Sequence, residues 1–180
     1  MAQEQPFHFD GNNIAVHRYV SPRQRELTTA ESEVRRISRD LKIPTDEAIQ
    51  EASRDMGRFV DGNAVLVPIP SSKGGTGANM ILCEALAKNS GAEILNVLGR
   101  EKPVPSSSKR RHEGLPGIKP EEHGMLVDEK SQMESLIEEG KYILLIDNVV
   151  TTGSTLSAAR AAIGVPCYGL VWSKAEEVLN

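Results

Sequence analysis

Apolar runs that alternate with helical patterns constrain the fold of this chain more than any other feature of its sequence. Residues 63–70 (NAVLVPIP), 142–147 (YILLID) and 165–172 (VPCYGLVW) are apolar runs with segments of helical character between them. Successive strands joined through helices form parallel sheets with both faces covered, and such strands are apolar almost throughout. The sequence therefore predicts an α/β fold with a parallel central sheet flanked by helices.

Shorter patterns complete the expected core. The spacing of apolar residues and the lengths of the segments predict helices up to residue 88 after the first apolar run, over 128–139 and over 154–163, and a further strand over 92–98. Each expected strand is thus followed by a helix or a loop that leads into the next strand.

The N-terminal third has a different pattern. Residues 22–59 hold two helical patterns separated by the sequence PTD, and residues 7–20 alternate around DGNN, a turn sequence typical of a β-hairpin. We expect one domain over residues 1–180, with a hairpin flap and two helices in 1–60 and the core in 61–174.

The composition excludes several functional classes. The chain has 180 residues and a formal net charge of −4, which argues against general attraction to nucleic acid or to an anionic membrane. Its two cysteines, Cys83 and Cys167, sit in apolar segments without metal-ligand spacing and are expected to be reduced core residues. With no secretory signal pattern and no apolar run of membrane-spanning length, the sequence predicts a cytoplasmic protein.

The segment 100–124 is rich in Pro, Gly and Ser and lacks an apolar period, so we expect a mobile loop. Between residues 100 and 119 it carries two acidic residues and six basic ones, which are Arg100, Lys102, Lys109, Arg110, Arg111 and Lys119. Two interpretations remain open: a solvated linker, which is the commoner meaning of such a run, and a lid that closes over an anionic ligand.

The end of the strand at 142–147 carries polar groups of a particular kind. Asp147 and Asn148 offer a carboxylate and an amide that suit the vicinal hydroxyls of a sugar. Residues 151–155 (TTGST) add hydroxyls and closely spaced backbone N–H groups where the next helix begins, which suits a phosphate monoester. Strand termination and helix capping are the alternative explanation for each of these residues taken singly.

Together these residues resemble the signature of type I phosphoribosyltransferases that binds phosphoribosyl pyrophosphate (PRPP), in the version of small ComF-like members. VPIPSSKGG follows the first core strand where that family has its pyrophosphate loop, and the resemblance covers residues 63–172. No GK[ST] follows the glycines near residue 75, and the third glycine of a dinucleotide fingerprint is missing. Walker-type and Rossmann-type sites are therefore disfavoured.

The resemblance implies a role for each part of the site. The ribose hydroxyls would be held by Asp147 and Asn148, and a Mg²⁺ cofactor would bind through substrate oxygens and water, with Asp147 as its protein contact. A closing lid would bring in the charges of Arg110 and Arg111, with Lys109 beside them. The 5-phosphate would be bound by Thr151, Thr152, Gly153, Ser154 and Thr155. The pyrophosphate would be bound by Ser71, Ser72, Lys73 and Gly74.

This sequence departs from the family signature at Asn148, where the family usually has a second acid. The lost charge would attract a carbocation about 4 Å away with roughly 4 kcal/mol at an effective dielectric constant near 20. Two functions from different classes therefore remain: a phosphoribosyltransferase that joins PRPP to a base-like nitrogenous acceptor, and a regulatory module that binds PRPP or a nucleotide with little catalysis. Thr151 stands where purine-salvage relatives often have an acid, so a 6-oxopurine acceptor is disfavoured.

The sequence says least about which residues would bind the acceptor base. Trp172 could stack on a nucleobase or pack against the N-terminal helices, and the segment 1–60 could form the hood that covers the acceptor in the family. His112 and His123 lie in the expected lid, where they could carry protons or be solvated. Relatives commonly form homodimers, although no residue here specifies an interface.

Overall fold

The computed structural model of the chain describes residues 7–9, 11–22, 25–105, 110, 113–128 and 130–176. The elements in chain order are β1 (Phe7–Phe9), β2 (Asn13–Tyr19), α1 (Thr29–Asp40), α2 (Asp46–Met56), η1 (Gly57–Phe59), β3 (Ala64–Pro68), α3 (Gly77–Ser90), β4 (Glu93–Ile94), β5 (Leu98–Arg100), η2 (Pro120–His123), β6 (Met125–Val127), α5 (Lys130–Glu138), β7 (Tyr142–Val150), α6 (Ser154–Ile163) and β8 (Cys167–Ala175).

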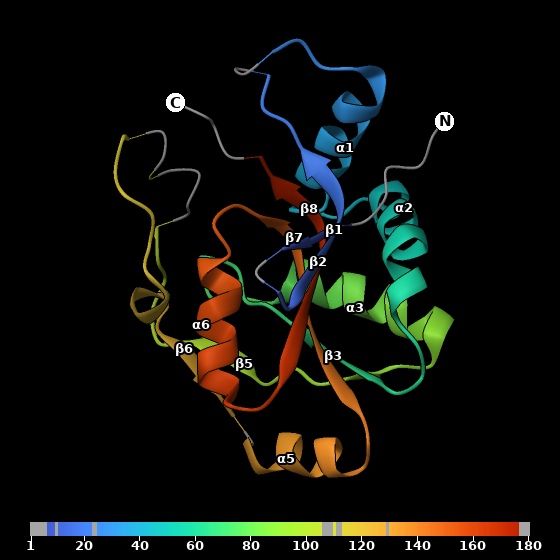
Figure 1. The fold of residues 1–180 in the computed structure, drawn as a ribbon, viewed down its shortest axis with the longest axis vertical. Helices are drawn as coiled ribbons and strands as arrows, with labels where there is room; N and C mark the ends of the chain where they lie inside the picture. The colour runs from blue at the N-terminus through green and yellow to red at the C-terminus, as the bar shows by residue number, and fades with distance from the viewer. Residues whose placement is uncertain are drawn as a thin grey trace.

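The central sheet confirms the predicted fold class. Its strand order is β1-β2-β8-β7-β3-β4, and every neighbouring pair is parallel except β1 with β2. Five of the six strands of the sheet are therefore parallel to one another, with α6 on one side of the sheet and α2 and α3 on the other (Figure 1). The carboxyl ends of β3 and β7, which are adjacent and parallel, lie at the same edge.

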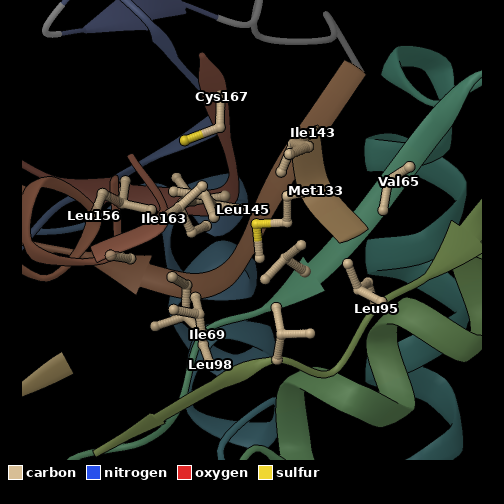
Figure 2. Packing of buried hydrophobic residues seen from close by; sticks show 14 of the residues in the cluster. Val65, Ile69, Leu95, Leu98, Met133, Ile143, Leu145, Leu156, Ile163 and Cys167 are labelled. Atoms are coloured by element: carbon tan, nitrogen blue, oxygen red, sulfur yellow. The ribbon is translucent and has the colours of Figure 1, made fainter. Parts of the chain in front are cut away.

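Alternating side chains of the strands build one apolar core on each face of the sheet. In β3, Val65 and Val67 belong to the core under α5 and α6, whereas Leu66 belongs to the core under α1, α2 and α3. Figure 2 shows the first core, in which Met133 of α5 lies among side chains of β3 and β7 such as Leu145. Both faces are covered, which explains why these strands are apolar almost throughout.

The N-terminal hairpin forms, but it does not stand apart as the expected flap. β1 and β2 pair antiparallel, and β2 then pairs in parallel with β8, from Asn13 opposite Gly169 to Tyr19 opposite Ala175. Ala15 and Val16 of β2 are fully buried, one in each core, so this strand is an integral part of the sheet. A strand with apolar side chains on both faces removes more apolar surface from water when it joins the sheet than when it covers a ligand.

The strand expected at 92–98 is two strands in two sheets. β4 pairs with β3, whereas β5 pairs antiparallel with β6 to form a separate ribbon. The segment 100–124 therefore begins at the end of one ribbon strand and ends at the start of the other. Its two ends are ordered by pairing, which the absence of an apolar period did not predict.

Two smaller expectations can be compared with the structure. Cys83 and Cys167 are both free and buried, as predicted from their apolar surroundings. Burial raises the pKa of both thiols above the ordinary value. Within the described ranges, no helix combines the length and the apolar character needed to cross a bilayer.

Gly169 of β8 is a glycine because of what faces it. A Cβ atom there would overlap Asn13 Oδ1 and lie 3.0 Å from Leu156 Cδ1. Asn13 is 1% exposed, and its Oδ1 accepts a hydrogen bond of 2.8 Å from Arg160. The side chain of Asn13 therefore has no room to move without losing a buried partner.

We expect Gly169→Ala to lower the free energy of unfolding by about 2–4 kcal/mol, because overpacking and a disturbed buried hydrogen bond act together. Urea denaturation followed by circular dichroism measures this loss. Gly99→Ala in β5 is the matched control, since a Cβ there meets nothing within 4 Å. Equal stabilities of the two variants would contradict the role assigned to Asn13.

Candidate functional site

A cavity of about 540 Å³ opens at the carboxyl ends of β3 and β7. The loop between β3 and α3 and the loop between β7 and α6 both line it, so the structure brings the two predicted binding loops together. The predicted residues that line it are Ser71, Ser72, Lys73, Asp147, Asn148, Thr151, Thr152, Gly153, Ser154 and Thr155. Gly74 and Arg110 are not among the lining residues, and Lys109 and Arg111 lie outside the described part of the chain.

Asp147 is the only carboxylate among the described residues that line the cavity. Its Oδ1 accepts hydrogen bonds from the N–H of Asn148 at 2.8 Å and from Nδ2 of Asn79 at 3.1 Å. No described residue donates to Oδ2, which is therefore left for a ligand. Burial raises the pKa of Asp147 to about 6, although these two hydrogen bonds and the nearby charge of Arg100 favour the ionised form.

Asn79 is a functional residue that sequence reasoning missed. It lies in the first turn of α3, is 7% exposed, and its Nδ2 also donates to the carbonyl of Ile69 at 2.8 Å. One amide group thereby connects the end of β3 to the carboxylate at the end of β7. No sequence pattern links positions 68 residues apart, so only the fold reveals this contact.

Asn148 presents a hydrogen-bond donor to the cavity. The backbone N–H of Val149 donates to Asn148 Oδ1 at 2.7 Å. This bond orients the side-chain amide with its oxygen toward the backbone, so that Nδ2 can donate to a ligand. Asp147 and Asn148 are thus an acceptor and a donor side by side. Such a pair complements two neighbouring hydroxyl groups, one of which donates while the other accepts.

Two helix N-termini face the cavity, and in neither does the N-cap residue supply a side-chain cap, although Oγ1 of Thr152 accepts from the first N–H of α6 at 3.4 Å. α6 begins at Ser154 after Gly153, whose φ of 85° requires the left-handed conformation that glycine adopts freely, and α3 begins after Thr76. Neither cap residue donates or accepts through its side chain at the first turn, whereas Thr28 and Thr45 cap α1 and α2. The other N–H groups of these first turns and the helix dipoles favour an anion at this place.

The loop between β3 and α3 is held by its own backbone. The N–H of Ser71 donates to the carbonyl of Gly75 at 2.8 Å, and the N–H of Gly74 donates to the carbonyl of Ser71 at 2.9 Å. Gly74 supports this turn with a φ of 103°, so its part is to shape the loop. Lys73 lines the cavity, is exposed, and has no ion-pair partner among the described residues.

Positive charge surrounds the cavity. The charged residues that line it are three cations, Lys42, Lys73 and Arg100, and one acid, Asp147. Lys42 comes from the turn between α1 and α2 and was missed in the sequence, because that turn lies far from both loops along the chain. Since the whole chain carries a net charge of −4, this excess of cations is a local feature that suits an anionic ligand.

Arg100 is fixed in place and not part of a closing lid. It donates from Nε to the carbonyl of Ser71 at 2.8 Å, from Nη2 to that of Pro70 at 3.2 Å, and from Nη1 to that of His123 at 2.8 Å. Burial lowers its pKa from the ordinary value of 12.5, so the charge rests at the cavity wall. In this structure the predicted basic segment therefore contributes one arginine, Arg100, to the cavity wall.

His123 is likewise buried at 2% exposure in η2, and it is not a lid histidine. Its Nδ1 lies 3.1 Å from Nη1 of Arg100, and its Nε2 lies 3.1 Å from Oγ of Ser154. Burial, and then the neighbouring charge of Arg100, lower the pKa of His123. His112 lies outside the described residues.

The segment after Arg100 contacts the first loop before it leaves the cavity. The N–H of Val104 donates to the carbonyl of Ser72 at 2.9 Å, and Ile118 lines the cavity and is buried. Arg110 turns back on its own segment, where Nε donates to the carbonyl of Pro116 at 2.7 Å. The structure thus does not bring Arg110 to the cavity as the resemblance implied.

Trp172 does not face a ligand, which corrects its expected place at an acceptor. Its side chain is 1% exposed, its ring centroid lies 4.2 Å from that of His17, and Nε1 donates to the carbonyl of Val34 at 3.5 Å. The alternative of packing against the N-terminal helices is therefore correct. Side chains along β8 alternate between the two faces of the sheet, and Trp172 lies on the face that packs against α1 and α2.

Comparison of the sequence with models of known protein families and with curated proteins gave no match. The geometry of the cavity therefore carries the functional argument. Within the described ranges, no group of three or more His, Cys, Asp or Glu side chains forms a metal cluster.

Proposed function

We propose that this protein transfers the 5-phosphoribosyl group of PRPP to a nitrogenous base and releases pyrophosphate. The observation that carries the proposal is the cavity itself, which is lined by an acceptor–donor pair, Asp147 and Asn148, and by the first residues of α3 and α6. PRPP has the complementary order of groups: a phosphate, a vicinal diol and a pyrophosphate. The three cations of the cavity wall match its negative charge.

The reaction breaks the bond from C1 of the ribose to the pyrophosphate oxygen and forms a bond from C1 to a base nitrogen. The bonding electrons leave with pyrophosphate, and positive charge develops on the ribose as the bond breaks. The Asp147 carboxylate beside the diol stabilises this charge, while Lys73 and Arg100 favour the departing anion. Catalysis by these groups is chiefly positioning and electrostatic stabilisation.

The residues present fit a magnesium ion that is bound mainly by its substrate. Mg²⁺ prefers oxygen ligands and keeps several waters, and Asp147 Oδ2 has no donor among the described residues. Asp147 would hold the ion, directly or through water. When bound, the ion supplies charge neutralisation for the pyrophosphate oxygens.

The test begins with calorimetry of PRPP in the presence of Mg²⁺, followed by a panel of purine, pyrimidine and pyridine bases monitored for pyrophosphate release. We expect micromolar to millimolar binding and release with at least one base, both depending on Asp147. Asp147→Ala is the loss variant, and Asp128→Ala, an exposed acid away from the cavity, is its control. Failure of PRPP to bind the wild-type protein would overturn the proposal.

A specific observation favours a second candidate, a regulatory module that binds PRPP or a nucleotide without efficient chemistry. Asn148 offers an uncharged donor where a second carboxylate would stabilise the developing positive charge. Binding in the calorimeter without pyrophosphate release for any base would support this module over the enzyme.

Asn148→Asp separates the two candidates. The N–H of Val149 still has an oxygen to donate to, so the side chain keeps its orientation and adds a negative charge next to the ribose. If the protein is the enzyme, we expect kcat for pyrophosphate release to rise about tenfold. This rise corresponds to a part of the roughly 4 kcal/mol by which a negative charge attracts a positive charge 4 Å away before screening. Asn148→Ala, which adds no charge, should not raise kcat. An unchanged kcat in Asn148→Asp would show that the missing charge does not limit turnover.

A further inference from the structure

A continuous chain of hydrogen bonds between cavity-lining residues joins the two binding loops. It runs from the carbonyls of Pro70 and Ser71 through Arg100 to His123, and from His123 to Ser154. The two carbonyls belong to the loop after β3, and Ser154 is the first residue of α6. Arg100 and His123 therefore brace the two loops against each other.

The chemistry of Arg100 determines the protonation of His123. A guanidinium has donors only, so His123 Nδ1, at 3.1 Å from Arg100 Nη1, must accept and carries no proton. The neutral imidazole then holds its proton on Nε2. That N–H donates to Ser154 Oγ at 3.1 Å.

Ser154 Oγ receives a second hydrogen bond from within its own loop. The hydroxyl of Thr152 donates to Ser154 Oγ at 3.2 Å, while Oγ1 of Thr152 accepts from the backbone N–H of Ser154 at 3.4 Å. Both lone pairs of Ser154 Oγ are therefore in use. Its own O–H is left as a donor, and Ser154 lines the cavity.

We propose that His123 is a positioning residue that makes Ser154 a dedicated hydrogen-bond donor to the phosphate of the ligand. This inference rests on the proposed function and extends it to a residue that acts through Ser154. A serine hydroxyl without fixed partners can rotate and either donate or accept. With both lone pairs occupied it can only donate, and an anionic phosphate oxygen accepts only.

Other groups around His123 agree with a neutral ring. Arg100 is the cation that faces it, and Glu122 of η2 is the acid whose charge it feels. Ser154 and Thr152 of the phosphate loop are uncharged. A proton on Nδ1 would point at the guanidinium, so the contact with Arg100 itself opposes the charged ring.

Two substitutions divide the functions of the imidazole. In His123→Asn, Oδ1 stands near the position of Nδ1 and continues to accept from Arg100, but nothing reaches Ser154. In His123→Gln, Nε2 of the glutamine stands near the position of the imidazole Nε2 and continues to donate to Ser154. A merely structural role for His123 would be affected similarly by both variants.

The experiment is calorimetry of ribose 5-phosphate, and of inorganic phosphate, with the full chain. We expect His123→Asn to weaken binding of ribose 5-phosphate about tenfold or more, and His123→Gln to stay within about threefold of wild type. His17→Asn changes a part-buried histidine that does not line the cavity and should leave affinity unchanged. Circular dichroism verifies that each variant is folded at the temperature of the measurement.

A double-mutant cycle supplies the second readout. Ser154→Ala alone should weaken binding about tenfold, and His123→Asn combined with Ser154→Ala should lose no more than Ser154→Ala, because His123 acts through that hydroxyl. Additive losses, or equal affinities of the Asn and Gln variants, would overturn the role of His123 and leave the proposed function standing. A wild-type protein that binds neither ribose 5-phosphate nor phosphate would overturn both.

Discussion

The Asp147→Asn variant is expected to lose phosphoribosyl transfer by about a hundredfold or more while its melting temperature rises. The loss follows from removal of the one carboxylate beside the ribose, whose attraction for a positive charge at 4 Å is roughly 4 kcal/mol before screening. An asparagine keeps Oδ1 for the N–H of Asn148 and for Asn79. The local structure should therefore survive the change.

The gain in stability follows from the pKa of Asp147. Burial raises this pKa from 3.8 to about 6, so ionisation costs more in the folded chain than in the unfolded chain. Above pH 6 the folded protein carries this cost, and between pH 6 and 4 it binds a proton that the unfolded chain does not yet bind, which stabilises the fold. The uncharged amide in Asp147→Asn removes a cost of about 1–2 kcal/mol at pH 7, or about 2–6 °C in melting temperature.

The same pKa predicts the pH profile of the proposed transfer by the wild-type protein. The value of kcat/KM should fall as the pH drops through about 6, because Asp147 must be ionised to stabilise the ribose. Kinetics of pyrophosphate release from pH 5 to 8 and thermal melts over the same range measure both effects. Asp128→Asn should change neither, and a melting temperature for Asp147→Asn well below that of wild type would contradict the assigned burial cost.

Trp172→Ala is expected to lower the free energy of unfolding by about 3–5 kcal/mol. The indole is 1% exposed and is among the largest fully buried side chains in the described part of the chain. Its removal leaves a cavity between β8 and the N-terminal helices and deprives His17 of its ring contact. For a chain of 180 residues this loss corresponds to a fall of roughly 10 °C in melting temperature.

Chemical denaturation of Trp172→Ala and of Tyr168→Ala provides the comparison. Tyr168 lies on the same strand, is 47% exposed, and should cost less than about 1 kcal/mol. Below its melting temperature Trp172→Ala should bind PRPP as wild type does. An unchanged stability together with a raised KM for the base would restore the stacking role that the structure argues against.

The sequence predicted the parts of the site that follow strand ends. Asp147, Asn148 and the loops at 71–74 and 151–155 were found because an apolar strand, a polar turn and a helix start are local patterns. Parallel strands bring such turns to one edge, so their meeting at a cavity was expected from the fold class alone. Gly74 was assigned with them, but its backbone shapes the turn without lining the cavity.

The residues that were missed come from segments without a pattern. Arg100 was counted as one of six loop cations, yet its contact with Ser71 spans 29 residues and its contact with His123 spans 23. Composition predicts only a mobile loop here, as a linker or a lid, because no apolar period marks a two-strand ribbon as short as β5 with β6. No sequence pattern marks Lys42 as a cavity residue, because its position there depends on where the turn between α1 and α2 packs.

The sequence by itself determined an α/β chain with polar and hydroxyl-rich turns at two strand ends, because hydrophobic period and turn chemistry act over a few neighbouring residues. Only the tertiary structure decided that Trp172 belongs to the core, that β2 completes the sheet, and that Arg100 and His123 join the two loops. These outcomes depend on contacts between distant segments. Such contacts are selected by packing and by the satisfaction of buried polar groups, which no local pattern encodes.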